Sequence, residues 1–167
     1  TSPGRWITND DATLAWTTCQ FIDMGTFLFD SNSTIDTCTY LGCAQITHDE
    51  AVMNGRNISG YTGAANTSAL VYNINADPDG EMDNMKFVAN SGTLSHAIEF
   101  GTSIPTTSIT LRGCDFTGYS ATQDVNDSIF HFLDTTGTIT LNLVGCTSDV
   151  AFANSYRTAG VVVTVVE

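Results

Sequence analysis

Four carboxylates are gathered between residues 77 and 83, where acidic residues alternate with proline, glycine and methionine. They are Asp77, Asp79, Glu81 and Asp83. Carboxylate oxygens are the ligands that Ca²⁺ prefers, so this segment is the strongest metal-site candidate in the sequence. It lacks the length and spacing of an EF-hand loop, and Asp-Pro-Asp-Gly is also a favourable plain turn. Calcium is therefore the one cofactor that the sequence suggests, with an ordinary turn as the alternative.

Residues suited to acid–base or nucleophilic catalysis are scattered. The histidines His48, His96 and His131 are far apart in the chain, and no nucleophile-elbow motif accompanies them. His131 alternates with Phe130 and Phe132, which predicts that it faces outward from a strand. Glycoside hydrolysis requires two carboxylates at a defined separation, and the sequence shows no repeated pair of acids. We therefore predict no catalytic residues and expect a protein that is not an enzyme.

The five cysteines follow a repeat and not a metal-binding or disulfide pattern. Their number is odd, and no Cys-x-x-Cys pair is present. Cysteine, or methionine in one copy, recurs after a small or turn-forming residue at Cys19, Cys43, Met85, Cys114 and Cys146. The residues just before these sites are Thr18, Gly42, Asn84, Gly113 and Gly145. Because glycine and asparagine tolerate a left-handed backbone, we predict a bend there and a buried, unpaired Cys or Met after it.

A second apolar column runs through the chain at the same intervals. Its members are Phe29, Tyr72, Phe100 and Phe132. The spacings along this column agree to within a residue with the last three spacings of the cysteine column. The longest interval contains residues 48–66, which we interpret as a long loop on the second turn. Of the residues that follow the cysteine column, only Asp115 is acidic, so no column of paired acids is expected there.

Two columns with one shared period indicate short strands that stack in parallel over successive turns of the chain. The pattern resembles the right-handed parallel β-helix family, the fold of pectate-lyase-like enzymes and of many virus tailspikes. The resemblance implies an all-β, single-stranded β-helix (a solenoid) of about five to six turns over residues 14–167, with residues 1–13 as an N-terminal arm or cap. The alternative is a β-sandwich or jelly roll, which also uses short strands and glycine-rich turns.

The composition restricts the partners. Five Lys and Arg face 18 Asp and Glu, giving a net charge of −13, which disfavours nucleic acid and anionic membranes. Residues 161–166 read as an apolar strand without a polar cap, which suggests that a partner subunit or a continuation of the chain covers it. We expect a homotrimeric structural protein of a virion, at the virion surface or outside the cell. It would be a phage capsid decoration (cement) protein, contacting other virion proteins such as the capsid protein, or a tail fibre or spike module.

The alternative function is a β-helix that binds or cleaves polysaccharides. Its glycan site would lie on the long second-turn loop around Tyr61, with calcium at residues 77–83. Loops are where stacked repeats usually carry such sites.

Overall fold

Strands make up almost all of the regular structure. The computed structural model describes residues 6–7, 14–23, 27–29, 33–41, 43, 46–49, 52–59, 68–73, 81–87, 96–101, 107–119, 128–133 and 135–167. Within these ranges the chain is all-β, and its one helical element is the short 3₁₀-helix η1 (Phe152–Asn154). The described strands form two sheets. Within each sheet, every described strand pair is parallel.

The seven-stranded sheet, here called sheet A, contains strands β1 (Trp6–Ile7), β4 (Phe27–Phe29), β7 (Ile46–Asp49), β9 (Ser68–Asn73), β11 (His96–Phe100), β13 (Phe130–Phe132) and β15 (Tyr156–Thr158), in that spatial order. The nine-stranded sheet, sheet B, runs in the order β16 (Val162–Val166), β14 (Thr138–Val144), β12 (Thr107–Arg112), β10 (Glu81–Phe87), β8 (Val52–Ser59), β5 (Ser33–Asp36) and β2 (Leu14–Thr17). Two short strands extend sheet B, because β3 (Gln20–Ile22) pairs with β6 (Thr39–Leu41), which also pairs with β8.

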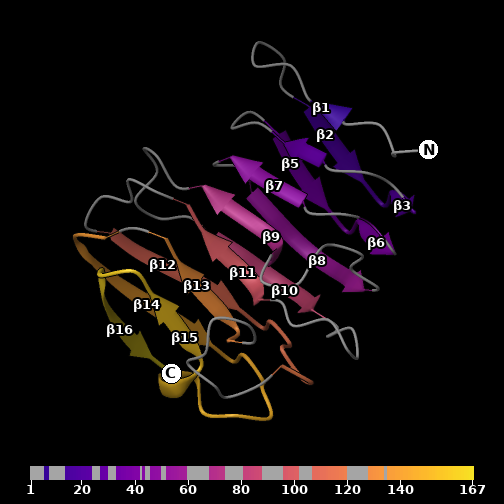
Figure 1. The fold of residues 1–167 in the computed structure, drawn as a ribbon. Helices are drawn as coiled ribbons and strands as arrows, with labels where there is room; N and C mark the ends of the chain where they lie inside the picture. The colour runs from indigo at the N-terminus through magenta and orange to yellow at the C-terminus, as the bar shows by residue number, and fades with distance from the viewer. Residues whose placement is uncertain are drawn as a thin grey trace.

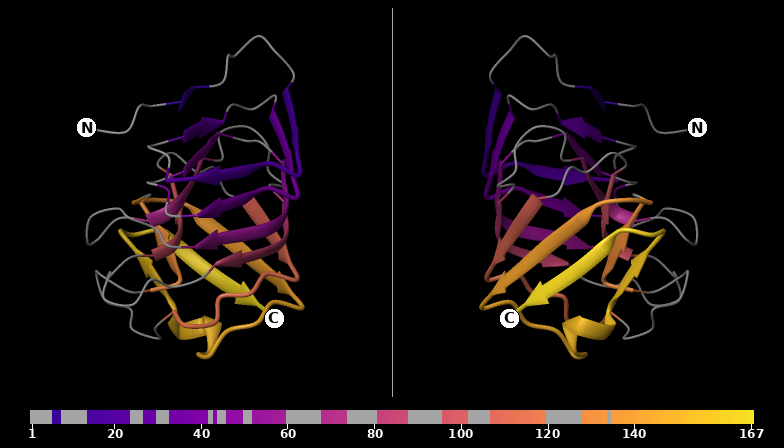
Figure 2. Two further views of the ribbon diagram at one scale, coloured as in Figure 1. Left: turned by 90° about the vertical axis from the view of Figure 1, so that its right-hand side faces the viewer. Right: turned by 90° about the vertical axis from the view of Figure 1, so that its left-hand side faces the viewer.

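The chain alternates between the two sheets. Each pass contributes one strand to sheet A and one or two to sheet B, and neighbouring strands in a sheet come from successive passes (Figure 1). Figure 2 shows the passes layered from the N-terminal strands at the top to the C-terminal strands at the bottom. The first strand lies in the segment expected to be an arm, where Trp6 and Ile7 pair with Phe27 and Leu28.

A bend follows the first part of five of the described passes through sheet B. The residue at the bend has a positive φ at Thr18 (57°), Thr37 (61°), Asn84 (55°), Gly113 (61°) and Gly145 (65°). The left-handed conformation predicted at Thr18, Asn84, Gly113 and Gly145 is therefore confirmed, whereas Gly42 lies outside the described residues. Gly113 has a second reason to lack a side chain, since a Cβ there would lie 2.6 Å from Oδ1 of Asn84.

The prediction that Cys43 stands in the cysteine column is wrong in register. Phe21 pairs with Tyr40, and the Thr39 backbone N–H donates to the Cys19 carbonyl at 2.9 Å, so Cys38 is the neighbour of Cys19. The next member is Arg56, which pairs with Met85. The error has a simple origin, because Gly-Cys at residues 42–43 imitates the repeat while an arginine occupies the true third position.

The predicted long second-turn loop is wrong for residues 48–49 and 52–59, whereas residues 50–51 and 60–66, with Tyr61, lie outside the described part of the chain. Residues 46–49 and 52–59 form β7 and β8, so the longest interval contains an additional pass between the two sheets. In sheet A, His48 stands in register between Phe29 and Tyr72. The pass was not recognised in the sequence because a histidine, and not an apolar residue, occupies its position in the aromatic column.

Aromatic rings stack along the columns in the interior. Phe87 and Phe116 stack with centroids 5.1 Å apart, and Phe100 and Phe132 stack at 4.7 Å. Phe116 also meets Phe130 edge to face at 5.2 Å, which joins the side chains of the two sheets. These separations match the spacing of neighbouring strands, so the parallel register itself creates the ring stacks.

The residues predicted to form the core have the following positions. Cys43, Met85, Cys114, Phe100 and Phe132 are buried, while Cys19 and Cys146 are half-buried and pack against the core. The backbone of Phe29 and Tyr72 is in the same register column as Phe100, and their side chains lie outside the described part of the structure. None of the five cysteines forms a disulfide.

Candidate functional site

The predicted calcium segment is only partly described. Asp77 and Asp79 lie outside the described residues, whereas Glu81 and Asp83 belong to strand β10. Asp83 faces Arg112 on the neighbouring strand, with Oδ1 3.7 Å from the guanidinium. Within the described ranges, no three His, Cys, Asp or Glu side chains come together as a metal site. Calcium binding therefore stays a prediction for this segment.

The outer face of sheet B carries a short polar ladder that includes Asp115. Lys86 Nζ lies 3.4 Å from Asp115 Oδ2, and the Thr147 hydroxyl donates to Asp115 Oδ1 at 3.3 Å. The side chain and backbone of Thr117 hydrogen-bond Asp115 and lower its pKa, and Lys86 lowers it further. Lys86 is about half-exposed, so this ion pair contributes little to stability.

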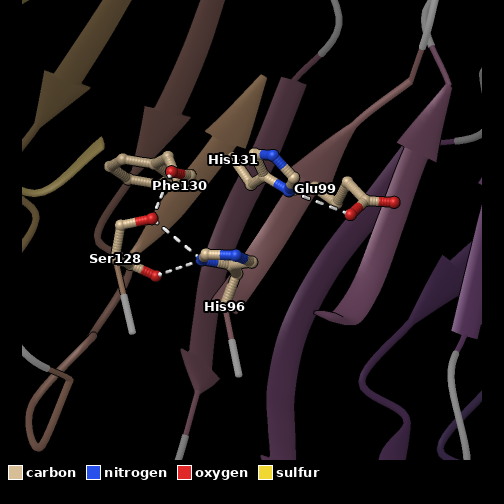
Figure 3. Close-up of polar contacts among 5 residues, drawn as sticks. All are labelled: His96, Glu99, Ser128, Phe130 and His131. Carbon is tan, nitrogen blue, oxygen red and sulfur yellow. Dashed lines mark hydrogen bonds and ion pairs between the residues drawn. The ribbon is translucent and has the colours of Figure 1, made fainter. Parts of the chain in front are cut away.

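A more enclosed polar cluster lies on sheet A, where β11 and β13 run side by side (Figure 3). His96 begins β11, and Ser128 lies just before β13. Both residues are fully buried. Nδ1 of His96 lies 3.0 Å from the Ser128 carbonyl oxygen and 2.8 Å from its Oγ, and Oγ also lies 2.8 Å from the Phe130 carbonyl oxygen.

The hydrogens of this cluster can be assigned from the acceptors that surround them. A carbonyl oxygen can only accept, so we assign the hydrogen to Nδ1 of His96, from which it is shared between the carbonyl and hydroxyl oxygens of Ser128. The Ser128 hydroxyl then donates to the Phe130 carbonyl. Ser128 is therefore not a nucleophile activated by His96, because His96 acts as a donor toward it and both groups are shielded from solvent. This cluster ties β13 to β11 and does not form a hydrolase dyad.

A charged row lies beside that cluster. His131 Nδ1 is 3.1 Å from Glu99 Oε2, and their side chains are only 12% and 16% exposed. The burial of Phe130 and Phe132 on either side of His131 agrees with the prediction that His131 faces away from the core. Arg157 of β15 is the next register partner of His131. Glu99, His131 and Arg157 thus place a carboxylate, an imidazole and a guanidinium on three successive strands.

The rings of the two histidines connect the row to the buried cluster. Their centroids lie 4.6 Å apart, tilted by 39°. Sequence reasoning missed this arrangement because it treated the histidines as isolated. The available signal was the repeat itself, since His96 and Ser128 are separated by 32 residues, as are Glu99 and His131.

Comparison with known proteins adds no relative: no family model, no curated protein and no solved structure matches this chain. Among the residues that the structure describes, no helix has the length and apolar character needed to cross a membrane.

Proposed function

We propose that this chain is a single-stranded right-handed parallel β-helix that acts as a structural virion protein, assembled as a homotrimer. Its role is that of a phage capsid decoration (cement) protein or a module of a tail fibre or spike. The observation that carries the proposal is the parallel stacking of successive passes in both sheets.

The parallel pairing supports a β-helix over a β-sandwich. Sandwich and jelly-roll folds are built from antiparallel strands, whereas every described pair here is parallel. Crossovers between parallel strands of one sheet are right-handed in nearly all proteins, which supports the proposed hand. Alternation between the sheets, with neighbours from successive passes, is the connectivity that a β-helix requires.

The edge strand supports assembly through packing. Among the described strands, β16 has β14 as its one neighbour in sheet B. Val163 and Val165 on this strand are only half-buried although they pack against the core. Val162 and Val166 are 61% and 47% exposed. A second copy that covers this edge would pair the backbone and bury the valines.

The chemistry of the described residues also favours a structural role. The contact between Ser128 and His96 holds two strands together. Both side chains are fully buried, so the Ser128 hydroxyl is shielded from solvent. The acidic composition keeps a repetitive β-protein soluble and limits unspecific edge pairing. These features fit a protein that works by packing against neighbours in a particle, such as the capsid protein.

The test is the native mass in solution, measured by light scattering on a sizing column over a range of concentrations. We expect a trimer for the wild type. Val162→Lys places a charge on the edge strand and should shift the mass toward the monomer. Val144→Lys is the matched control, because Val144 is 56% exposed on the same sheet but lies one strand further in. A wild-type monomer at every concentration contradicts the proposed assembly.

One observation favours a second function, the binding or cleavage of polysaccharides. Glu99, His131 and Arg157 offer a carboxylate, an imidazole and a guanidinium in one row, which are groups that hydrogen-bond acidic sugars. The test is depolymerisation and binding of acidic polysaccharides, with and without a chelator. Glu99→Gln should weaken either activity, and Glu167→Gln, at an exposed carboxylate elsewhere, should not. Absence of both product and binding removes this alternative.

A further inference from the structure

Two pairs of cysteines occupy equivalent places on neighbouring passes of the chain. Cys19 neighbours Cys38, and Cys114 neighbours Cys146. In the first pair the Thr39 N–H donates to the Cys19 carbonyl at 2.9 Å, and in the second the Thr147 N–H donates to the Cys114 carbonyl at 2.8 Å. The same ladder contact therefore sets both pairs in register.

The thiols are also placed alike. Cys38 Sγ lies 3.4 Å from the Trp16 carbonyl, and Cys146 Sγ lies 3.4 Å from the Leu111 carbonyl. Each of these carbonyls is three residues before the first cysteine of its pair. Within each pair, the pKa of one thiol also depends on the other. The register thus places the two cysteines of each pair side by side on adjacent passes.

The second pair has one thiol inside and one toward solvent. Cys114 is fully buried, whereas Cys146 is half-buried. The described pairing of β16 with β14 runs to Asn142, whose partner is Val166. Cys146 is the point at which a reagent enters, and Cys114 stands behind it.

The two thiols also differ in acidity. The hydrogen bond from Cys114 stabilises the Cys146 thiolate and lowers the pKa of Cys146 to about 7. The same contact, followed by burial, raises the pKa of Cys114. A thiol with a pKa near the ambient pH is the most effective attacking group in thiol–disulfide exchange. Cys146 therefore suits the attacking role, and Cys114 suits the resolving role.

We propose that Cys114 and Cys146 form a redox-active thiol pair, which a low-molecular-weight disulfide such as oxidised glutathione converts into a disulfide between neighbouring passes. In-register residues on adjacent strands have Cα atoms about 4.8 Å apart, within the range that a disulfide spans.

The reaction balances with that oxidant alone. The Cys146 thiolate attacks one sulfur of the small disulfide, the S–S bond breaks, and one glutathione thiolate leaves. Cys114 then loses its proton and attacks Cys146 Sγ, the mixed disulfide breaks, and the second glutathione leaves. Two protein thiols are oxidised, and one glutathione disulfide is reduced to two glutathione molecules.

The experiment treats the folded full chain with oxidised glutathione and follows its intact mass. The wild type should lose two hydrogens, and a peptide map without reductant should join the peptides that contain Cys114 and Cys146. Cys114→Ala should stop at one added glutathione, and Cys146→Ser should give neither product at this pair. A Cys19→Ser, Cys38→Ser background removes the equivalent pair. The reaction at Cys114 and Cys146 should persist there, because it does not use those two cysteines.

The pH dependence separates this pair from ordinary thiols. The rate should reach half of its maximum near pH 7, because the thiolate fraction of Cys146 rises through its pKa of about 7. A stable glutathione adduct on the wild type, a disulfide between other cysteines, or no reaction of the folded chain would each overturn the proposal. Circular dichroism of both variants verifies that each result refers to folded protein.

Discussion

Phe116 packs against rings of both sheets, and its removal provides a strong test of the packing. It is fully buried, stacks on Phe87 at 5.1 Å, and meets Phe130 and Phe152 edge to face at 5.2 and 6.1 Å. Phe130 comes from sheet A, whereas Phe116 follows a strand of sheet B. Truncation to alanine therefore opens a cavity between the layers and not only within one column.

The expected cost follows from these contacts. Replacing a buried Phe by Ala destabilises proteins by about 3–5 kcal/mol through lost transfer energy and the cavity left behind. Each ring pair contributes about 0.5–1.5 kcal/mol beyond its area, so three ring partners place Phe116→Ala near the upper end, about 5 kcal/mol. For a domain of this size, that corresponds to a fall in melting temperature of roughly 10–20 °C.

Urea unfolding followed by circular dichroism measures this change. Phe116→Leu is the matched control, because it keeps most of the volume and should cost only about 1.5 kcal/mol. Phe100→Ala provides a second comparison, since Phe100 is equally buried and stacks on Phe132, and it should cost about 3–5 kcal/mol. If Phe116→Ala costs less than about 2 kcal/mol, or no more than the leucine variant, the ring column is not the core that the structure indicates.

Two further predictions concern the bends and the outer ladder. Gly113→Ala should destabilise by about 2 kcal/mol or more in urea unfolding, because its φ is 61° and the new Cβ would lie 2.6 Å from Asn84 Oδ1. Gly145→Ala has a φ of 65° with nothing within 4 Å of the Cβ, so it should cost only about 1 kcal/mol, and equal costs would contradict the steric argument. Hydrogen bonds from Thr117 are the main cause of the lowered pKa of Asp115. The ionised carboxylate therefore stabilises the fold above the unfolded pKa of about 3.9, and this contribution is lost as the pH falls through the lower folded pKa. Asp115→Asn should therefore lower the stability slightly at pH 7 and flatten its fall below about pH 4, and an unchanged acid limb would refute this assignment.

The sequence predicted the periodic parts of the structure well. A position could be recognised where the same physical requirement recurs from pass to pass. Examples are the left-handed position at Asn84 and Gly113 and the ring column at Phe100 and Phe132. The period failed where a pass carries other residue types. Arg56 replaces the sulfur residue of its column, so one whole pass was mistaken for a loop.

The polar cluster could not be predicted in the same way. His96 and Ser128 carry no local motif, and their contact depends on the register between β11 and β13. The relation is visible only as a separation of 32 residues, which Asp115 and Thr147 share. In a chain of stacked passes, residues one repeat apart are spatial neighbours, so candidate sites must be sought across that interval and not among adjacent residues.

The same rule explains how an acidic chain tolerates parallel stacking. In-register strands place equal positions directly beside each other, where like charges destabilise the pair. Among the register pairs of the described residues, no acid faces another acid: Asp83 faces Arg112, Asp115 faces Lys86, and Glu99 faces His131. The first two pairs are well exposed and contribute little energy. These charge pairs avoid repulsion between acids but do not determine the strand register. The buried ring columns set the register, because a slip of one residue would turn those rings outward.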